Sequence, residues 1–169
     1  MTSRADFTDE EWARLGRAPL VAALAISLAD RSGPIGAIKE SSAAFKTLVE
    51  AAREGGFGDF VKSVAHDVAA RAQRRENPMA GFAPDRHHAL DEILDELRAV
   101  NALLHAKAEP QDVADFREWI RTASQRAALA AREGGFLGVG GQLVSDREQQ
   151  MLETLGEIFG VPRDAPPGP

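Results

Sequence analysis

Four carboxylates at predicted helix ends are the residues best placed to do chemistry. Asp30 and Glu133 stand where two alanine-rich helical segments should end, and Glu40 and Glu148 follow near the start of the next helix. A carboxylate is disfavoured at a helix C-terminus, because the backbone carbonyls there already carry partial negative charge. Such a position calls for a loop N–H, an arginine or a bound cation. Paired carboxylates and loop carbonyls are the oxygen ligands that Ca²⁺ and Mg²⁺ require, so we predict a divalent-cation site at these junctions.

The same carboxylates have purely structural explanations, which stay open. Asp30 can accept hydrogen bonds from the backbone N–H groups of Ser32 or Gly33 in an Asx turn. Glu148 lies three residues after Ser145 and can complete a capping box. Neither loop has the ligand spacing of an EF-hand, so no calcium-binding motif of that kind is predicted.

A second set of potential ligands lies in a later predicted helix. His88, Asp91, Glu92 and Asp95 share one helical face and could bind a transition metal. Acidic residues are favoured in the first turns of any helix, however, because they complement its dipole. No other segment supplies an obvious third or fourth ligand, so a solvated helix start is the simpler interpretation.

The remaining motifs give no support for catalysis. The glycine-rich stretch 134–141 follows a predicted helix and lacks the Lys-Ser/Thr ending of a phosphate-binding loop. No nucleophile-elbow pattern is present, and no serine, histidine and acid show a recognisable catalytic arrangement. We therefore expect a protein that is not an enzyme, with paired-carboxylate catalysis as the least favoured hypothesis.

The composition predicts one globular domain that does not bind nucleic acid. Of 169 residues, 44% are hydrophobic and 27% charged, which is typical of a folded domain rather than a disordered chain. The net charge of −6 opposes binding to phosphate backbones, which requires clustered lysine and arginine. The chain has no cysteine, which excludes disulfides and thiolate ligands and suits a cytoplasmic location.

No segment is expected to insert into a membrane. The N-terminus is polar and then acidic, unlike a secretory signal. The longest apolar run, 18–29, has 12 residues, whereas a bilayer span needs about 20. We expect this run to form a buried core helix.

Helix start and stop signals predict an all-α fold over residues 1–161. Thr8 begins a capping box with Glu11, and Phe7 and Trp12 form a hydrophobic staple across it. Pro19 is expected to end this first helix and to open a second one that reaches residue 29. With the later segments, this gives about seven helices in one bundle. The later helices are expected from 34 or 35 to 53, from 57 to 75, from a cap at Asp85, from Glu109-Pro110, and from a cap at Ser145.

Two segments are expected to lie outside helices. Residues 77–84 are rich in proline and glycine and are predicted to form a mobile linker. Residues 162–169 are too proline-rich and polar to continue a helix, so we predict a disordered tail.

The two halves of the chain share one frame. Trp12 and Trp119, the only tryptophans, stand 28 and 29 positions before Glu40 and Glu148. Each tryptophan is followed by an alanine-rich run that ends in a carboxylate. The pattern predicts internal pseudo-two-fold repetition, with halves at about 7–53 and 116–160.

These junctions resemble the TerB-like tellurite-resistance family. The resemblance lies in Ala22 to Asp30 with the following Gly33 and Glu40, and in the segment 127–148 with its ending Val-Ser-Asp-Arg-Glu. That family is an all-helical bundle with internal two-fold repetition, whose acidic turn residues are proposed to bind divalent metal. The resemblance implies a role in stress response beside calcium-binding or membrane-associated partners. It also implies metal binding at Asp30, Glu40, Glu133 and Glu148.

The leading hypothesis is therefore a non-enzymatic helical module that binds a divalent cation. The alternative is an adaptor whose helices bind another protein and whose acidic residues are purely structural. An exposed apolar patch of more than a few hundred Å² would favour the adaptor.

Overall fold

Helices make up the regular structure of the part of the chain that can be described. The computed structural model describes residues 1–29, 49–85, 87–133 and 146–160, without the side chains of 127–133 and 148. No strand occurs within these ranges, which confirms the predicted all-α class. Residues 49–54 are also helical. The elements are η1 (Arg4–Asp6), α1 (Asp9–Ala29), α4 (Asp59–Gln73), α5 (Ala89–Lys107), α6 (Pro110–Glu133) and α7 (Asp146–Phe159).

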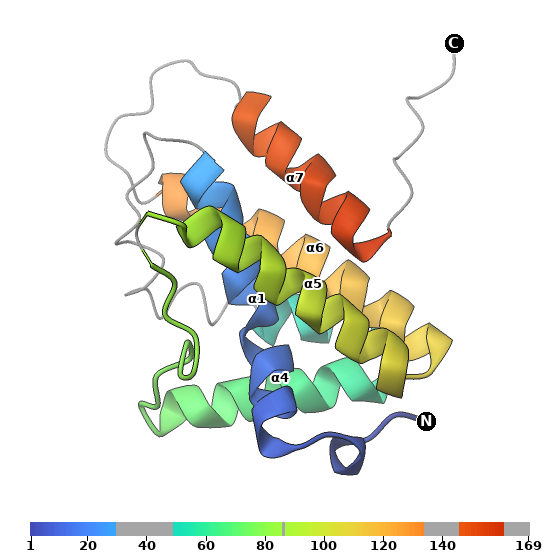
Figure 1. Ribbon diagram of the computed structural model, residues 1–169. Helices are drawn as coiled ribbons and strands as arrows, with labels where there is room; N and C mark the ends of the chain where they lie inside the picture. Colours follow the sequence, from blue (N-terminus) through green and yellow to red (C-terminus); the bar gives the residue numbers. More distant parts are fainter. Residues whose placement is uncertain (30–48, 86, 134–145, 161–169) are drawn as a thin grey trace.

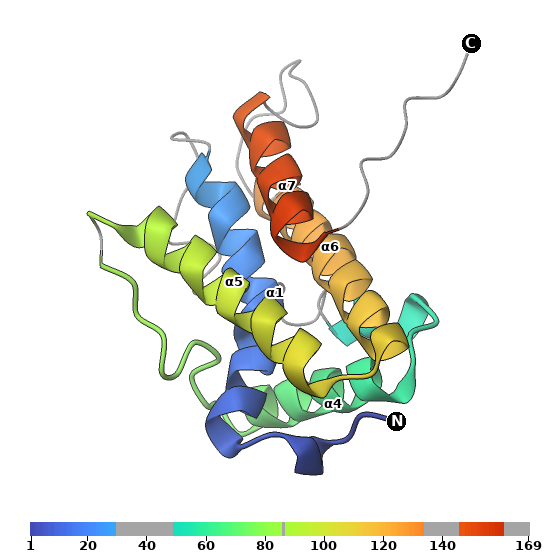
Figure 2. The same cartoon turned by 45° about the vertical axis from the view of Figure 1, so that its right-hand side comes forward.

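The helix α1 is the centre of the bundle. It packs against α4, α5, α6 and α7, and the ribbon shows α5, α6 and α7 gathered around its upper part (Figure 1). The helix α4 lies across the lower end of the bundle in both views (Figures 1 and 2). Because α1 and α6 both run away from that end, their last turns lie together at the opposite end.

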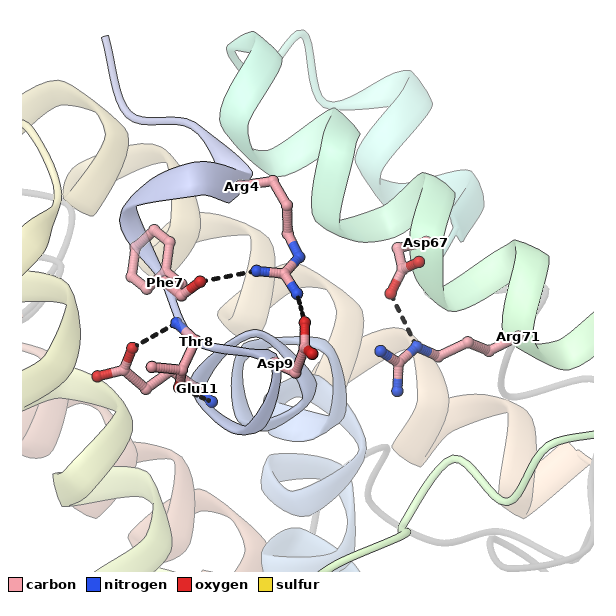
Figure 3. Close-up of polar contacts among 7 residues, drawn as sticks. All are labelled: Arg4, Phe7, Thr8, Asp9, Glu11, Asp67 and Arg71. Atoms are coloured by element: carbon pink, nitrogen blue, oxygen red, sulfur yellow. Dashed lines mark hydrogen bonds and ion pairs between the residues drawn. The ribbon is translucent and has the colours of Figure 1, made fainter.

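The start of α1 has the predicted capping box. The Thr8 N–H donates to Glu11 Oε2 at 2.7 Å, and the Glu11 N–H donates to Thr8 Oγ1 at 3.2 Å (Figure 3). The rings of Phe7 and Trp12 lie 5.8 Å apart between centroids, which confirms the hydrophobic staple. Arg4 also stabilises the start of α1, because its Nη1 donates to the Phe7 carbonyl at 2.8 Å and its guanidinium pairs with Asp9.

The predicted break at Pro19 is wrong. The helix α1 continues through Pro19 without interruption and ends at Ala29. Proline removes one helical hydrogen bond and its ring crowds the preceding turn, which is unfavourable in isolation. Here every residue from Arg17 to Ile26 is buried, so packing on all sides outweighs that local cost. The restriction that a proline places on the residue before it is a local effect, and it does not take this packing into account.

The helix α1 is long enough to span a membrane. Its 21 residues make it the one described helix that is long and apolar enough to cross a bilayer. The 12-residue apolar run at 18–29 is only the second part of this helix, so the shortness of the run does not exclude a membrane span. Of the most apolar window of α1, 67% is buried against the other helices. That burial is typical of the core helix of a globular bundle.

Aromatic rings connect the helices across the core. The ring centroid of Phe60 on α4 lies 5.7 Å from that of Phe7, 6.1 Å from that of Trp12 and 5.8 Å from that of Phe116. Phe116 in turn meets Trp119 edge-to-face at 5.3 Å. Both tryptophans are thus in the same core. Edge-to-face pairs add to the free energy gained by burial, and they fix α1, α4 and α6 relative to one another.

The other helices each bury one apolar stripe, as their periodicity predicts. Residues at helical spacing face the core, and their neighbours on the opposite side remain exposed. The buried residues are Val61, Val64 and Val68 on α4; Ile93, Leu97, Val100 and Leu104 on α5; Val113, Ile120 and Ala123 on α6; and Met151, Leu155 and Phe159 on α7.

The start of α5 differs from the prediction. Asp85 was expected to cap this helix, but α5 begins at Ala89 and His88 stands at its N-cap position. Asp85 instead accepts a hydrogen bond from the His87 N–H at 2.8 Å, in a turn before the helix. Aspartate stabilises such turns as readily as it caps helices, and the sequence does not separate the two roles.

The count of about seven helices and the pseudo-two-fold repeat stay predictions. Two of the predicted helices are one continuous α1, and residues 30–48 and 134–145 lie outside the described residues. The predicted disordered tail, 162–169, lies outside them as well.

Replacing Thr8 with alanine should lower the free energy of unfolding by about 1 kcal/mol, because the Glu11 N–H loses its acceptor. Thr8→Ser keeps the hydroxyl and should stay near the wild-type value. Urea denaturation measures both. Equal values for Thr8→Ala and wild type would show that the capping box does not stabilise α1.

The pH dependence of stability should include a contribution from Glu11. The Lys107 ammonium, 2.7 Å away, and the Thr8 backbone N–H hold the pKa of the Glu11 carboxyl below its usual value. A carboxyl whose pKa is lower in the folded state stabilises the fold above its unfolded pKa of about 4.3, and this contribution is lost as the pH falls. Glu11→Gln should therefore lose less stability than wild type between about pH 5 and pH 3. Thermal melts across this range measure the effect, and Glu10→Gln is the neighbouring control. The same pH dependence of the melting temperature in both variants would contradict a specific role of Glu11.

Candidate functional site

Two of the four predicted cation ligands belong to described helix ends opposite α4. Asp30 and Glu40 lie outside the described residues. Glu133 is the last residue of α6 and Glu148 lies in the first turn of α7, but their side chains are not among those described. The structure therefore gives helix positions for two of the four predicted ligands and leaves the ligand geometry untested.

Three helix ends meet at that end of the bundle. In both views the last turn of α1, the last turn of α6 and the first turn of α7 lie at the same end (Figures 1 and 2). Two of these are helix C-termini, whose free carbonyls carry partial negative charge. The two C-termini outweigh the partial positive charge at the N-terminus of α7, so the helix dipoles favour positive charge near the last turns of α1 and α6.

Among the described residues, the histidine and acid cluster at the start of α5 does not converge into a metal-binding group. No group of three or more histidine or acidic side chains is arranged to hold a metal within the described ranges. Glu92 Oε2 accepts a hydrogen bond from the Asp85 N–H at 3.0 Å, and Asp95 pairs with Arg98 at 2.6 Å. These carboxylates are occupied by the protein itself, which supports the interpretation as a solvated helix start.

A buried charged cluster, which sequence reasoning missed, joins α1 to α5. The side chains of Arg17 and Glu96 are only 3% and 8% exposed. Glu96 Oε1 accepts hydrogen bonds from Arg17 Nε at 2.9 Å, from Arg17 Nη2 at 2.6 Å and from Arg14 Nε at 3.1 Å. The partners lie 79 positions apart in the chain, so no local spacing could reveal the pair. The one available signal was an arginine within an otherwise apolar helical run.

The same arginine anchors the segment 77–84. Arg17 Nη1 donates to the Ala80 carbonyl at 3.1 Å, and its guanidinium carbon lies 6.0 Å from the Phe82 ring centroid. Gly81 between them has a φ of +80°, in the left-handed region that favours glycine. The side chains of Met79 and Phe82 also pack against the core. The middle of the predicted linker is therefore attached to α1 by a buried cation.

Each of the two larger grooves on the described surface contains an acid that is paired with an arginine. A groove of about 720 Å³ along α4 includes Asp67, which pairs with Arg71 at 2.8 Å (Figure 3). A groove of about 370 Å³ between α6 and α7 includes Glu118, which pairs with Arg121 at 2.5 Å. The Arg121 side chain lowers the pKa of the Glu118 carboxyl. A carboxyl held in its ionised form is a poor general acid.

The described residues leave little large hydrophobic side-chain surface fully exposed. Met1, at 92% exposure, is the exposed large hydrophobic residue within the described ranges. An adaptor that binds a partner through an apolar face would leave several such residues in contact with one another. No observation on this part of the chain favours the adaptor hypothesis over the cation-binding one.

Comparison with known proteins gives no relative. The chain matches no family model, no curated protein and no solved structure. The TerB-like interpretation therefore remains a resemblance of local residues.

The Arg17–Glu96 pair should be important for stability. Glu96→Ala leaves Arg17 buried without its counter-ion and should cost about 3–5 kcal/mol in the free energy of unfolding. Arg17→Met combined with Glu96→Leu removes both charges and should recover much of the loss. Asp95→Ala, which breaks an exposed pair one residue away, should change the value by at most about 1 kcal/mol. Chemical denaturation of the four proteins tests this, and equal losses for Glu96→Ala and Asp95→Ala would contradict it.

Proposed function

We propose that this chain is a non-enzymatic, TerB-like helical module that binds a divalent cation, Ca²⁺ or Mg²⁺, in a stress-response setting. The proposed ligands are the acidic residues of the two helix junctions, Asp30 with Glu40 and Glu133 with Glu148. The observation that supports the proposal is the meeting of the last turns of α1 and α6 with the first turn of α7 at one end of the bundle (Figures 1 and 2).

The C-terminal carbonyls of α1 and α6 favour a cation there. The carbonyls at the ends of α1 and α6 present partial negative charge to the same region. In the sequence, Asp30 follows Ala29 directly, and Glu133 is the last residue of α6. Ca²⁺ takes six to eight oxygen ligands from carboxylates, backbone carbonyls and water. Carboxylates placed beside free carbonyls supply that chemistry without cysteine, which the chain lacks.

A titration of the full, chelator-treated chain with Ca²⁺, Mg²⁺, Mn²⁺ and Zn²⁺ tests the proposal. An ion that binds only the folded state stabilises it by about 2.7 kcal/mol at 100 times its Kd, which raises the melting temperature by about 5–10 °C. Calorimetry should show saturable binding with Ca²⁺ or Mg²⁺. No heat and no thermal shift with any of the four ions would reject the proposal.

Variants assign the effect to the junctions. Asp30→Asn and Glu133→Gln remove one charge from each junction and should each weaken binding by about tenfold or more, because a charged oxygen ligand is lost. Asp95→Asn removes an exposed charge in the first half of α5 and is the matched control. Equal weakening by all three variants would indicate nonspecific attraction of the ion to an acidic protein.

A further inference from the structure

The groove between α6 and α7 combines an apolar floor with a polar wall. Its volume is about 370 Å³, within the range of small-molecule sites. Leu152 and Leu155 of α7 contribute apolar surface above the buried Ile120 and Phe159, and Gln125 and Gln149 contribute hydrogen-bonding groups. Arg117 lies in the same wall. The groove thus offers both burial for an apolar group and a fixed positive charge.

Arg117 differs from the other arginines with restricted solvent access. Among the described arginines that are buried or half-buried, it is the one whose guanidinium meets no carboxylate. Each of the others forms an ion pair with an acidic side chain: Arg4 with Asp9, Arg14 and Arg17 with Glu96, Arg71 with Asp67, and Arg121 with Glu118.

The side-chain contacts of Arg117 include no carboxylate among the described residues. Its Nη2 donates to Asn101 Oδ1 at 3.0 Å and contacts His105 Nε2. Its Nε is buried and has no hydrogen-bond partner. Burial lowers the pKa of Arg117, and no neighbouring carboxylate opposes this effect. A desolvated guanidinium without an anion is unfavourable, so the site favours the arrival of a negative group.

The end of α7 compensates Arg117 only in part. A Cβ placed on Gly160 would lie 3.9 Å from Arg117 Nη1 and 4.0 Å from Nη2, so the guanidinium lies at the C-terminus of this helix. The carbonyls there carry about half an elementary charge in total, less than a carboxylate would supply. Nη1 has no partner among the described residues and is not among their buried unpaired atoms. It is therefore the nitrogen that a ligand can reach.

We propose that the α6–α7 groove binds a small monocarboxylate with an apolar tail. Arg117 Nη1 binds the carboxylate, and the tail lies against Leu152 and Leu155. The other charges of the groove favour one negative group over several. Arg121 is already paired with Glu118, and Glu153 and Glu157 add negative charge to the lining of the groove. A polyanion would be repelled there, whereas a single carboxylate meets Arg117.

Octanoate is a suitable probe, with octanol and acetate as controls for the tail and the charge. Wild-type protein should show saturable binding of octanoate by calorimetry, and the amide signals of Ser124 and Gln149 should shift in NMR spectra. Octanol and acetate should each bind at least about tenfold more weakly, because each lacks one of the two interactions. Equal binding of octanol and octanoate, or no saturable binding of octanoate, would overturn the proposal.

Two variants locate the site. Arg117→Gln should weaken octanoate binding about 10- to 100-fold through loss of a charge-assisted hydrogen bond. Leu152→Glu places a negative charge at the half-buried edge of the groove and should weaken binding similarly, even if Arg117→Gln fails to fold. Arg98→Gln removes an exposed arginine of α5 and should leave binding unchanged. Unchanged binding in Leu152→Glu, or in a folded Arg117→Gln, would overturn the proposal.

Discussion

Burial of α1 on all sides is the constraint on which the rest of the structure depends. Four helices pack against it, and the stretch from Arg17 to Ile26 is buried throughout. Alanines at 18, 22, 23 and 25 have no exposed surface, and their small side chains let the neighbouring helices approach closely. The same packing keeps Pro19 within the helix. Because α1 and α6 then run in one direction, their C-terminal ends, of which Glu133 is one, lie at one end of the bundle.

Two arginine clusters of this fold differ in whether a carboxylate pairs with the buried charge. At Glu96, two arginines meet one carboxylate in a buried site, and Arg17 also holds the segment 77–84. At Arg117, a half-buried guanidinium has only neutral acceptors and a helix end around it. A buried pair that is complete is structural, because it has no further need of a partner. A desolvated charge that is incomplete is the kind of feature that binds a ligand, and this difference separates the two sites.

The sequence predicted what depends on local spacing. The capping box at Thr8, the staple between Phe7 and Trp12, and the apolar stripe of α5 all follow from residues within a few turns of each other. It did not predict the continuity of α1 at Pro19, because burial by distant helices decides that question. The Arg17–Glu96 pair and the absence of a described carboxylate beside Arg117 could not be predicted either. Tertiary packing decides which side chains meet these arginines. The predicted ligands Asp30 and Glu40 stay predictions, as does the side-chain geometry at Glu133 and Glu148.

The central claim is that one end of the bundle, formed by the ends of α1 and α6 and the start of α7, attracts a divalent cation. Paramagnetic Mn²⁺ tests it directly, because the ion broadens the NMR signals of nearby amides. Substoichiometric Mn²⁺ should broaden the amides of the last turns of α1 and α6 and the first turn of α7 together, and leave α4 at the far end unaffected. Broadening of α4 to the same extent, broadening of one helix end alone, or no localised broadening would contradict the account.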